Sequence, residues 1–295
     1  MRILLTGAPG AIGLAVTEDL VAHGHEVLGL ARSESAARRV LDAGGEPVRG
    51  ELADLELLAD AARAADGAIH LAFSNDFSDL ERSIAEEGAA MDAIGAALVG
   101  TGKPFSLVSG TTFSAGAVAT EHDPLTTTGP VGGRGVNAAR VLGLATQGVR
   151  TTAVRLPRSV HERDIAYGFA GLLIQAAQRS GVSAYVGDGG QRWPAVHRRD
   201  AASLFRLMIE RGEAGTAVNA VADEGDTMLA IATVIGRRLG LPVEQVPAET
   251  FGPLGEIFAM DQPASSAWTR STYGWAPTHP SLLVDLEAGD YPTRS

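Results

Sequence analysis

The 295-residue sequence predicts an α/β fold, a doubly wound parallel sheet followed by a small C-terminal lobe. Three observations favour this fold. Short apolar runs alternate with amphipathic stretches up to Leu156, which is the pattern of repeated βαβ units. Several of these runs are almost wholly apolar, as expected for strands that helices cover on both faces. Beyond Leu156 the alternation becomes irregular, and prolines are frequent after Pro242, which indicates a lobe of short elements.

This alternation sets the expected order of elements. Strands are expected near residues 2–5, 26–31, 47–48, 68–71, 105–108 and 151–156. Helices are expected between them, near residues 11–23, 34–43, 55–64, 79–100 and 133–146. Further helices are expected near 165–179, 200–211 and 228–239, with a strand near 217–221. Residues 1–156 are therefore interpreted as one domain and residues 157–295 mostly as a second lobe, with parts near 194–221 returning to the sheet.

Composition excludes several classes of protein. The chain has no cysteine, which excludes disulfides, thiolate metal sites and cysteine nucleophiles. Its 7 histidines lack the paired spacing of metal sites, so no metal is expected. A net charge of −11 with scattered arginines argues against nucleic-acid binding. No apolar run reaches the ~18 to 20 residues of a membrane span, and the first residues lead into a glycine turn rather than a signal peptide, so a cytoplasmic protein without membrane contact is expected.

A glycine-rich turn follows the first expected strand. Gly7, Gly10 and Gly13 are spaced three apart between that strand and an amphipathic helix. Gly7 allows a tight turn, Gly10 lets the backbone approach a pyrophosphate, and Gly13 permits close packing of helix on strand. Because the motif stands in the right context, it predicts a Rossmann-type domain that binds a dinucleotide.

The end of the second expected strand indicates which dinucleotide is bound. A free ribose 2′-hydroxyl is usually bound there by an acidic residue, whereas this chain has Arg32 and Ser33. An arginine and a hydroxyl suit a 2′-phosphate, so the predicted cofactor is NADP(H). Arg38 and Arg39 are further candidates for the phosphate, with solvated positions on a helix surface as the alternative.

Further motifs follow the glycine turn along most of the chain. They are Gly50-Glu51-Leu52, His70-Leu71-Ala72, Val108-Ser109-Gly110-Thr111, Arg155-Leu156-Pro157 and Val196-His197-Arg198-Arg199-Asp200. With them the chain resembles the extended short-chain dehydrogenase/reductase family, which includes NAD-dependent epimerases and dehydratases. The resemblance implies that the glycine turn binds pyrophosphate through residues that include Ala11 and Ile12.

The same resemblance implies roles for other residues at the strand ends. Glu51 and Leu52 would border the adenine, although the family usually has aspartate at position 51. The nicotinamide half of the cofactor would be bordered by Leu71, Ala72, Phe73, Ser109, Leu156 and Pro157. In the family, a serine or threonine after the fifth strand binds the substrate carbonyl, and Thr111 and Thr112 occupy this place.

The chain departs from the family in its catalytic pair. The family's proton donor is the tyrosine of a Tyr-x-x-x-Lys motif at the start of the helix after the fifth strand. Here that segment reads Pro-Val-Gly-Gly-Arg-Gly-Val-Asn over residues 130–137, the first tyrosine is Tyr167, and Lys103 is the one lysine of the sequence. The chain therefore resembles atypical members that lack the pair. Arg134 is the candidate for the lysine's place and would keep a positive charge there, but arginine does not relay a proton.

Other residues are candidates to replace the missing donor. His161 matches a family loop at the mouth of the substrate cleft, and an imidazole with a pKa near 6.5 is a competent acid. The alternative for His161 is a surface histidine paired with Glu162 or Asp164. Thr111 is a candidate to hydrogen-bond the substrate oxygen, with closure of the strand-end turn as its alternative.

The second lobe offers further candidates for the substrate pocket. Tyr167 and Tyr185 each carry a phenol that could replace the missing proton donor, and Tyr185 is also a candidate for the pocket; apolar packing is the alternative for both. Cleft walls are expected from two more pairs, in which Trp193 has the lobe core as its alternative: Asp76 with Phe77, and Arg192 with Trp193. His197 and Asp200 are expected to cap and orient a helix rather than to contact substrate.

These observations favour an NADPH-dependent reductase of a small to medium, apolar carbonyl, conjugated alkene or imine. The alternative is a protein that binds NADP(H) as a redox sensor or scaffold without turnover. The alanine- and glycine-rich helices near 79–100 and 133–146 correspond to the pair through which relatives often form homodimers; close packing on the sheet is the alternative use of their small residues.

Overall fold

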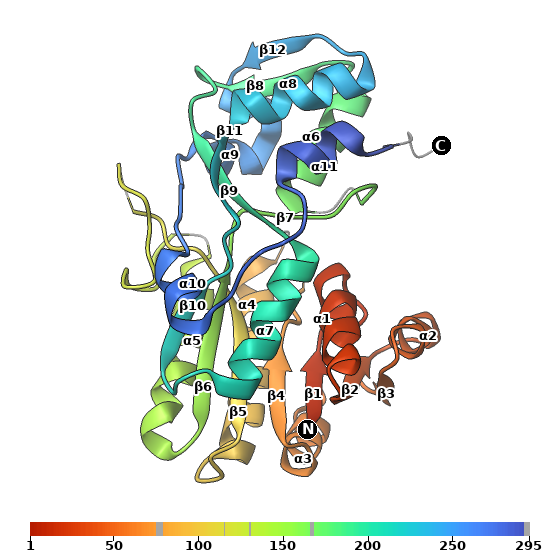
Figure 1. Ribbon diagram of the computed structural model, residues 1–295, viewed down its shortest axis with the longest axis vertical. Coiled ribbons are helices and arrows are strands. Elements are labelled where there is room, and N and C mark those ends of the chain that lie inside the picture. Colours follow the sequence, from red (N-terminus) through yellow and green to blue (C-terminus); the bar gives the residue numbers. More distant parts are fainter. Residues whose placement is uncertain (75–78, 115, 130, 166–167, 292–295) are drawn as a thin grey trace.

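The computed structural model describes residues 1–74, 79–114, 116–129, 131–165 and 168–291. They form two stacked lobes, with the first residues of the chain at the lower end of the larger lobe (Figure 1). The larger lobe holds a seven-stranded sheet in the order β10-β6-β5-β4-β1-β2-β3, and every neighbouring pair in it is parallel. The predicted fold class, a doubly wound α/β fold with a smaller second lobe, is confirmed.

The sheet and its helices follow the expected alternation. The strands are β1 (Arg2–Thr6), β2 (Glu26–Ala31), β3 (Glu46–Arg49), β4 (Gly67–His70), β5 (Pro104–Gly110), β6 (Arg150–Leu156) and β10 (Thr216–Asn219). The helices are α1 (Ala11–Ala22), α2 (Glu34–Asp42), α3 (Leu55–Ala64), α4 (Leu80–Leu98), α5 (Gly132–Gly143) and α7 (Arg198–Arg211). The strand order reverses beside β1, so a crevice is expected where the carboxyl ends of β1 and β4 diverge.

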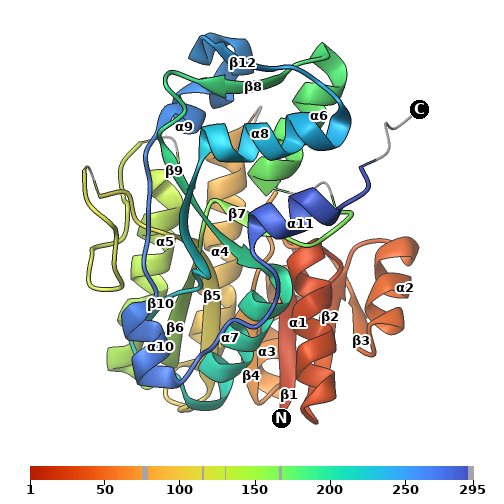
Figure 2. The same cartoon turned by 45° about the horizontal axis from the view of Figure 1, so that its top comes forward.

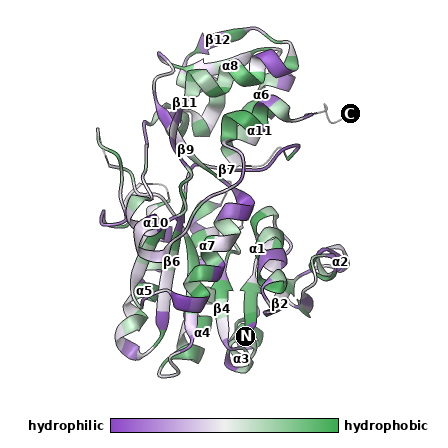
Figure 3. Ribbon diagram, viewed as in Figure 1, coloured by the Kyte–Doolittle hydropathy of each residue, from purple (hydrophilic) through white to green (hydrophobic). Residues whose placement is uncertain are grey.

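Alternating side chains of the strands build a core on each face of the sheet. In β1, Ile3 and Leu5 join the core that includes α1 and α7, whereas Leu4 joins the core that includes α3, α4 and α5. The side chains of Ile3, Leu4 and Leu5 are fully buried. Figure 3 accordingly shows this strand, found by its place in Figure 1, mostly in green, the colour of hydrophobic residues. Both faces are therefore covered, which explains why the strands read as continuous apolar runs.

The second lobe combines two small sheets with helices. Its strands are β7 (Ser159–His161), β8 (Ser183–Val186), β9 (Arg192–His197), β11 (Asp223–Thr227) and β12 (Val243–Val246), paired as β11-β9-β7 and β12-β8. Its helices are α6 (Gly168–Ser180), α8 (Met228–Leu239), α9 (Gly255–Ala259) and α11 (Leu282–Ala288). Sequence patterns missed all five of these strands, because they are short and β11 is almost entirely polar, so tertiary pairing rather than alternation determines them.

Two segments after residue 157 pack against the first lobe. Strand β9 leads into α7, which lies beside α1 on the sheet (Figure 2). Helix α10 (Ala267–Tyr273) also returns to this lobe, where the Thr269 hydroxyl contacts Glu121 and Trp275 donates from Nε1 to the carbonyl oxygen of Asp200 at 3.0 Å. The proline-rich tail therefore belongs to both lobes and connects them.

Candidate functional site

The turn between β1 and α1 requires glycine at two positions. Gly7 has a φ of +73°, and a Cβ there would lie 2.8 Å from the backbone nitrogen of Ala72. A Cβ on Gly13 would lie 2.1 Å from the carbonyl oxygen of Gly7. Both distances are shorter than real Cβ contacts, so larger residues would push the helix or the end of β4 away. The first and third glycines thus hold β1, α1 and the segment after β4 in close contact.

The middle glycine faces open space at the start of α1. Apart from its chain neighbours, a Cβ on Gly10 would meet only the carbonyl oxygen of Gly7, at 3.2 Å. Gly10 is the N-cap of α1 and no side chain caps this helix end. The amides that begin the helix therefore remain available to an anion. From the other side, Arg198 Nη1 donates to the carbonyl oxygen of Ala11 at 2.9 Å and ties this end to α7.

A buried hydrogen bond orders the end of β4 against this turn. Oγ1 of Thr6 and Nδ1 of His70 lie 2.9 Å apart, and the Ala72 amide donates to the same hydroxyl oxygen at 3.3 Å. Burial lowers the pKa of His70 to about 3, and the charge of Arg134 lowers it further in the same direction. The imidazole is therefore neutral near pH 7. Sequence analysis did not identify this pair, because its partners lie 64 residues apart.

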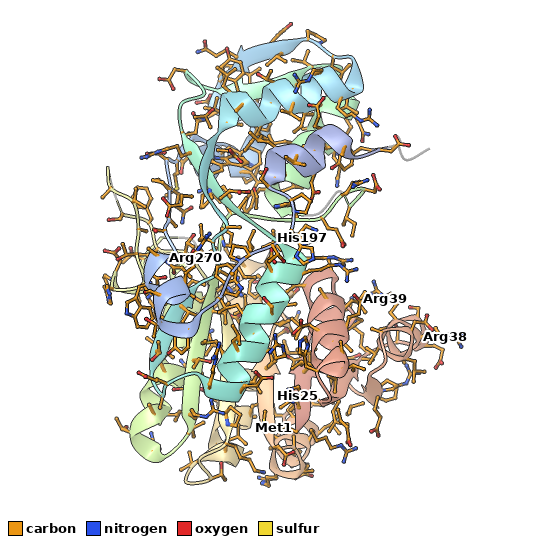
Figure 4. All side chains as sticks on the ribbon, in the orientation of Figure 1. Met1, His25, Arg38, Arg39, His197 and Arg270 are labelled. Carbon is orange, nitrogen blue, oxygen red and sulfur yellow. The ribbon has the colours of Figure 1, made fainter. Side chains whose placement is uncertain are left out.

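Arg32 and Ser33 follow β2 and differ in their contacts. The Ser33 hydroxyl accepts from the Ala36 amide at 3.2 Å and so caps α2. Arg32 is exposed and forms no ion pair or hydrogen bond within the described part of the chain. Arg38 pairs with Asp42 at 3.2 Å, and Figure 4 shows it on the outer side of α2 with Arg39 nearby. Among these residues, Arg32 has the cation that is most free to meet a phosphate.

Glu51 and Leu52 lie in the turn after β3. Glu51 is exposed, and its amide donates to Oδ2 of Asp54 at 2.7 Å. Leu52 is partly buried against the core that includes Leu58 of α3. These two residues therefore lie beside β2, on the same side of β1 as Arg32.

The end of β5 presents a hydroxyl without a partner. The Thr111 amide donates to the carbonyl oxygen of Leu156 at 2.9 Å, and Gln262 Nε2 donates to the Thr111 carbonyl oxygen at 2.9 Å. No described residue hydrogen-bonds the Thr111 hydroxyl, whereas the Thr112 hydroxyl donates to the carbonyl oxygen of Pro124 at 3.1 Å. Ser109 ends the same strand. Thr111, Leu156 and Ser109 thus meet where β5 and β6 end side by side.

Arg134 is held by an acidic partner that sequence analysis did not identify. Its guanidinium contacts Glu87 of α4, with Nη2 2.7 Å from Oε1, and lies 4.1 Å from the centre of the Phe73 ring. The Asn137 amide nitrogen donates to the carbonyl oxygen of Ile84 at 2.9 Å. Arg134 therefore lies beside Phe73, in the segment after β4, and is paired with the buried carboxylate of Glu87.

The prediction that His161 lies in a loop at a cleft mouth is wrong. His161 ends strand β7, is 5% exposed, and its Nδ1 lies 2.8 Å from Oδ2 of Asp285 in α11. Its partner is therefore neither Glu162 nor Asp164. Burial lowers the pKa of His161 to about 4, although nearby carboxylates oppose the shift. At neutral pH the imidazole carries no acidic proton, and no described contact joins it to Thr111, so it is poorly suited to be the acid proposed from sequence.

His197 and Asp200 orient the start of α7, as expected. The His197 side chain accepts from the Arg199 amide at 3.2 Å and is the N-cap of the helix. Its ring stacks on His279, with centroids 4.5 Å apart. Asp200 accepts from Nδ1 of His279 at 2.8 Å and holds the C-terminal tail. Figure 4 places His197 where the two lobes meet.

The structure separates the other candidates in the second lobe. Tyr185 lies in β8, which pairs with β12 in the part of the lobe farthest from the main sheet (Figure 1), so the predicted pocket role is wrong. Trp193 has no exposed surface and packs against Phe258 in the lobe core, so its alternative holds and the predicted cleft wall is wrong. Arg192 pairs with Asp261 at 2.8 Å and is half-exposed. Asp76, Phe77 and Tyr167 lie outside the described residues.

One residue near the strand ends was not identified from sequence. Arg158 follows Leu156 and Pro157, and its Nη2 donates to Oε1 of Gln262 at 2.6 Å. Because Gln262 also binds the Thr111 carbonyl oxygen, these contacts link the end of β6, the end of β5 and the second lobe. An arginine at this place in the sequence, directly after Leu156 and Pro157, carries no signal for such a role.

The described segments contain neither a metal-binding cluster nor a membrane-spanning helix. Among those residues, no group of three or more histidine, aspartate or glutamate side chains is arranged to hold a metal ion. None of the helices in the same segments is long and apolar enough to cross a membrane.

Comparisons with known proteins agree with this architecture. The model of the NAD dependent epimerase/dehydratase family matches residues 3–221. An uncharacterized protein of Schizosaccharomyces pombe is 41% identical over 297 residues, covering 99% of this chain and all of that protein. An uncharacterized protein of Saccharomyces cerevisiae is 39% identical over 295 residues, 98% of each. The solved UDP-glucose 4-epimerase of Thermus thermophilus in complex with NAD has a TM-score of 0.74 at 20% identity, over 97% of each chain. This last likeness is one of fold.

Proposed function

Because this chain belongs to the NAD-dependent epimerase/dehydratase family, we propose that it is an NADPH-dependent reductase of a small to medium, apolar substrate. The reducible group would be a carbonyl, a conjugated alkene or an imine. One observation carries the proposal: the open glycine turn at the uncapped start of α1 lies one strand away from the unpaired cation of Arg32. The second lobe, joined to the strand ends through Gln262, would hold the substrate.

The residues fit the two charged parts of the cofactor. The open space at Gly10 and the free amides of Ala11 and Ile12 suit the pyrophosphate, because a helix N-terminus attracts anions. Arg32 suits the 2′-phosphate, and a charge-assisted hydrogen bond of about 1.5–3 kcal/mol corresponds to a roughly ten- to hundredfold preference for NADPH over NADH. The structurally similar UDP-glucose 4-epimerase, which was solved in complex with NAD, supports a nicotinamide dinucleotide as the cofactor.

The proposed chemistry uses few protein groups. Bound NADPH supplies a hydride. The free hydroxyl of Thr111 would donate a hydrogen bond to the substrate oxygen, or to another atom that gains negative charge, and stabilise that charge. No strong acid accompanies it among the described residues, because His161 is neutral and bound to Asp285. Activated alkenes and iminium groups therefore suit the site better than plain ketones, since a delocalised anion or a neutral product needs less protonation.

A titration with NADPH and NADH, followed by a screen of aldehydes, ketones, enones and imines at 340 nm, tests the proposal. We expect NADPH to bind about ten- to hundredfold more tightly, and Arg32→Ala to remove that preference while leaving NADH binding unchanged. Arg63→Ala is the control, because Arg63 is exposed and pairs only with Asp60 of its own helix. Equal binding of the two cofactors would contradict the proposed NADPH specificity. Efficient turnover of plain ketones alone would contradict the preference for activated alkenes and iminium groups.

The missing acid also favours a second candidate, an NADP(H)-binding redox sensor or scaffold. Such a protein needs the cofactor site but no proton donor, and the described surroundings of Thr111 fit that requirement. Tight NADPH binding without reduction of any screened substrate would favour this candidate.

The exposed faces of α4 and α5, where Ala89 and Val136 are accessible in part, would allow a homodimer whether the protein is a reductase or a sensor.

A further inference from the structure

A buried arginine without a carboxylate partner lies directly after the proposed nicotinamide-bordering residues Leu156 and Pro157. Arg158 is 9% exposed, and no salt bridge to it exists in the described part of the chain. Burial lowers its pKa to about 10, and no nearby acid offsets the shift. A buried cation without a counter-charge is costly, so a position that keeps one is expected to meet an anion when the site is filled.

The hydrogen bonds of Arg158 leave part of its guanidinium unused. Nη1 donates to the carbonyl oxygen of Ile257 and Nη2 to Oε1 of Gln262, whereas Nε donates to none of the residues that the structure describes. The rings of Trp193 and Phe169 lie 5.1 Å and 5.6 Å from its Cζ. Aromatic rings hold the plane of the guanidinium in place but supply no counter-ion.

Two arginines of β6, the strand that precedes Arg158, have a different pattern of contacts. Arg150 is partly buried, and Arg155 is buried with its Nε unpaired among the described residues. Arg150, at the opposite end of β6, donates to three carbonyl oxygens, those of Met208, Ile209 and Gly212. Arg155 likewise donates to three carbonyl oxygens, and the carboxylates of Asp123 and Glu121 lie near it. Arg158 has fewer protein acceptors than either, and it lies at the strand end where the other site residues gather.

We propose that Arg158 binds a carboxylate of the substrate and so makes this site selective for acids that have an apolar body. The inference rests on the proposed function and names its substrate class. Gln262 contacts both Arg158 and the Thr111 carbonyl oxygen, so the carboxylate site and the free hydroxyl lie on either side of one side chain. The fork of the guanidinium matches the two oxygens of a carboxylate, which a neutral amide does not reproduce.

Binding of a carboxylate and its neutral amide tests the proposal without any turnover. Hexanoate and hexanamide would be titrated into the full-length protein, with and without saturating NADP⁺, while tryptophan fluorescence and the thermal midpoint are followed. Trp193 reports on the site because it lies against Arg158, and Trp193→Phe identifies its share of the signal. We expect hexanoate to bind about tenfold or more tightly than hexanamide and to raise the midpoint.

Three variants separate charge, fork and structure. Arg158→Met is expected to bind both probes equally, and Arg158→Lys to keep part of the preference because it keeps the charge but not the fork. Arg150→Met is the control, since it removes a partly buried arginine from the opposite end of β6 and should keep the full preference. Should Arg158→Met fail to fold, the comparison of the two probes in the wild-type protein still decides the matter.

Two results would overturn the inference: equal affinity of the wild-type protein for both probes, or an unchanged preference for hexanoate in Arg158→Met. Failure of the proposed function would look different. In that case the wild-type protein would not bind NADPH or NADP⁺, while the preference for hexanoate measured without cofactor would remain and would still depend on Arg158.

Discussion

Arg134 of α5 and Glu87 of α4 form a paired contact in which Nη2 and Nε of the arginine lie 2.7 Å and 3.0 Å from the same carboxylate oxygen. The Glu87 side chain has no exposed surface. In the family that the chain resembles, the start of this helix carries the catalytic tyrosine and lysine. Here an arginine near the start of the helix forms an ion pair that joins α5 to α4.

Removing one member of this pair is expected to destabilise the protein strongly. Arg134→Met leaves the Glu87 carboxylate buried without a counter-charge, which costs about 3–5 kcal/mol of the free energy of unfolding. The double variant Glu87→Met with Arg134→Met removes both charges and should recover most of that loss. Urea denaturation measures both values. Arg63→Met, which breaks an exposed pair with Asp60, should lower the free energy of unfolding by about 0–1 kcal/mol. If Arg134→Met lost no more than Arg63→Met does, the expectation would be refuted.

Gly13→Ala is expected to weaken cofactor binding. The added Cβ would lie 2.1 Å from the carbonyl oxygen of Gly7, so α1 must move away from the turn and its amides would leave the pyrophosphate position. We expect at least about tenfold weaker NADPH binding, together with a loss of about 1–3 kcal/mol in stability from overpacking. Calorimetric titration and urea denaturation measure the two effects.

Gly143→Ala is the control for that substitution. Gly143 ends α5 with a helical φ of −60°, and a Cβ there meets no atom within 4 Å. Alanine should therefore stabilise the protein by about 0.4–1 kcal/mol and leave NADPH binding unchanged. If both alanine variants bind NADPH alike, close packing at Gly13 does not determine the cofactor site.

Thr111→Val is expected to slow turnover without weakening cofactor binding. The substitution keeps the shape of the side chain and removes the hydroxyl that lacks a protein partner, so kcat should fall by about 10²-fold or more. Thr152→Val is the matched control, because Thr152 of β6 is buried and its hydroxyl also has no partner among the described residues. Steady-state rates at 340 nm with any substrate found in the screen decide the matter, and equal rates for both variants would exclude Thr111 from the chemistry.

Acidification is expected to destabilise the protein through its buried histidines. The pKa of His161 and of His197 is about 4, chiefly because of burial, compared with 6.5 for an exposed histidine. The unfolded chain therefore binds more protons than the folded chain between pH 6.5 and about 4, so this contribution is present above pH 6.5 and is lost as the pH falls through that range. For His161 the loss amounts to as much as about 3 kcal/mol.

Asp226 and Asp285 have the opposite effect on stability between pH 6.5 and about 4, because their protonation favours the folded protein. Burial raises the pKa of Asp226 to about 6 and also raises that of Asp285. The contribution of His161 is therefore best read as a difference between variants. Urea denaturation from pH 7 to pH 4 should show a shallower loss of stability for His161→Asn than for the wild-type protein. Parallel curves would mean that His161 is protonated in the folded protein.

Local signals in the sequence predicted the fold and the family correctly. The positions of β1, α1 and β2 follow from apolar runs, a glycine turn and amphipathic spacing, all of which act over a few residues. The assignment of Arg32 to a 2′-phosphate depends on the same local context and stays a prediction. So do the roles given to Glu51 and Thr111.

Long-range contacts explain the predictions that failed. His161 was expected in a loop because it matches a loop of the family that the chain resembles, but it is buried and bound to Asp285, 124 residues away. Trp193 was placed at a cleft, and the aromatic core of the second lobe encloses it instead. For Arg134, the paired carboxylate of Glu87 on another helix was not predicted. In each case the deciding partner lies on an element that sequence spacing does not bring near.

The sequence by itself determined the parallel sheet and the glycine turn, because strand alternation and the backbone demands of Gly7 depend on neighbouring residues. Only the tertiary structure decided which side chains at the strand ends remain free. The Thr111 hydroxyl stays unpaired while that of Thr112 is used, and Arg158 reaches Gln262, 104 residues away, but no carboxylate within the described segments. The reason is physical: the availability of a polar group depends on which distant partners folding brings within hydrogen-bond distance.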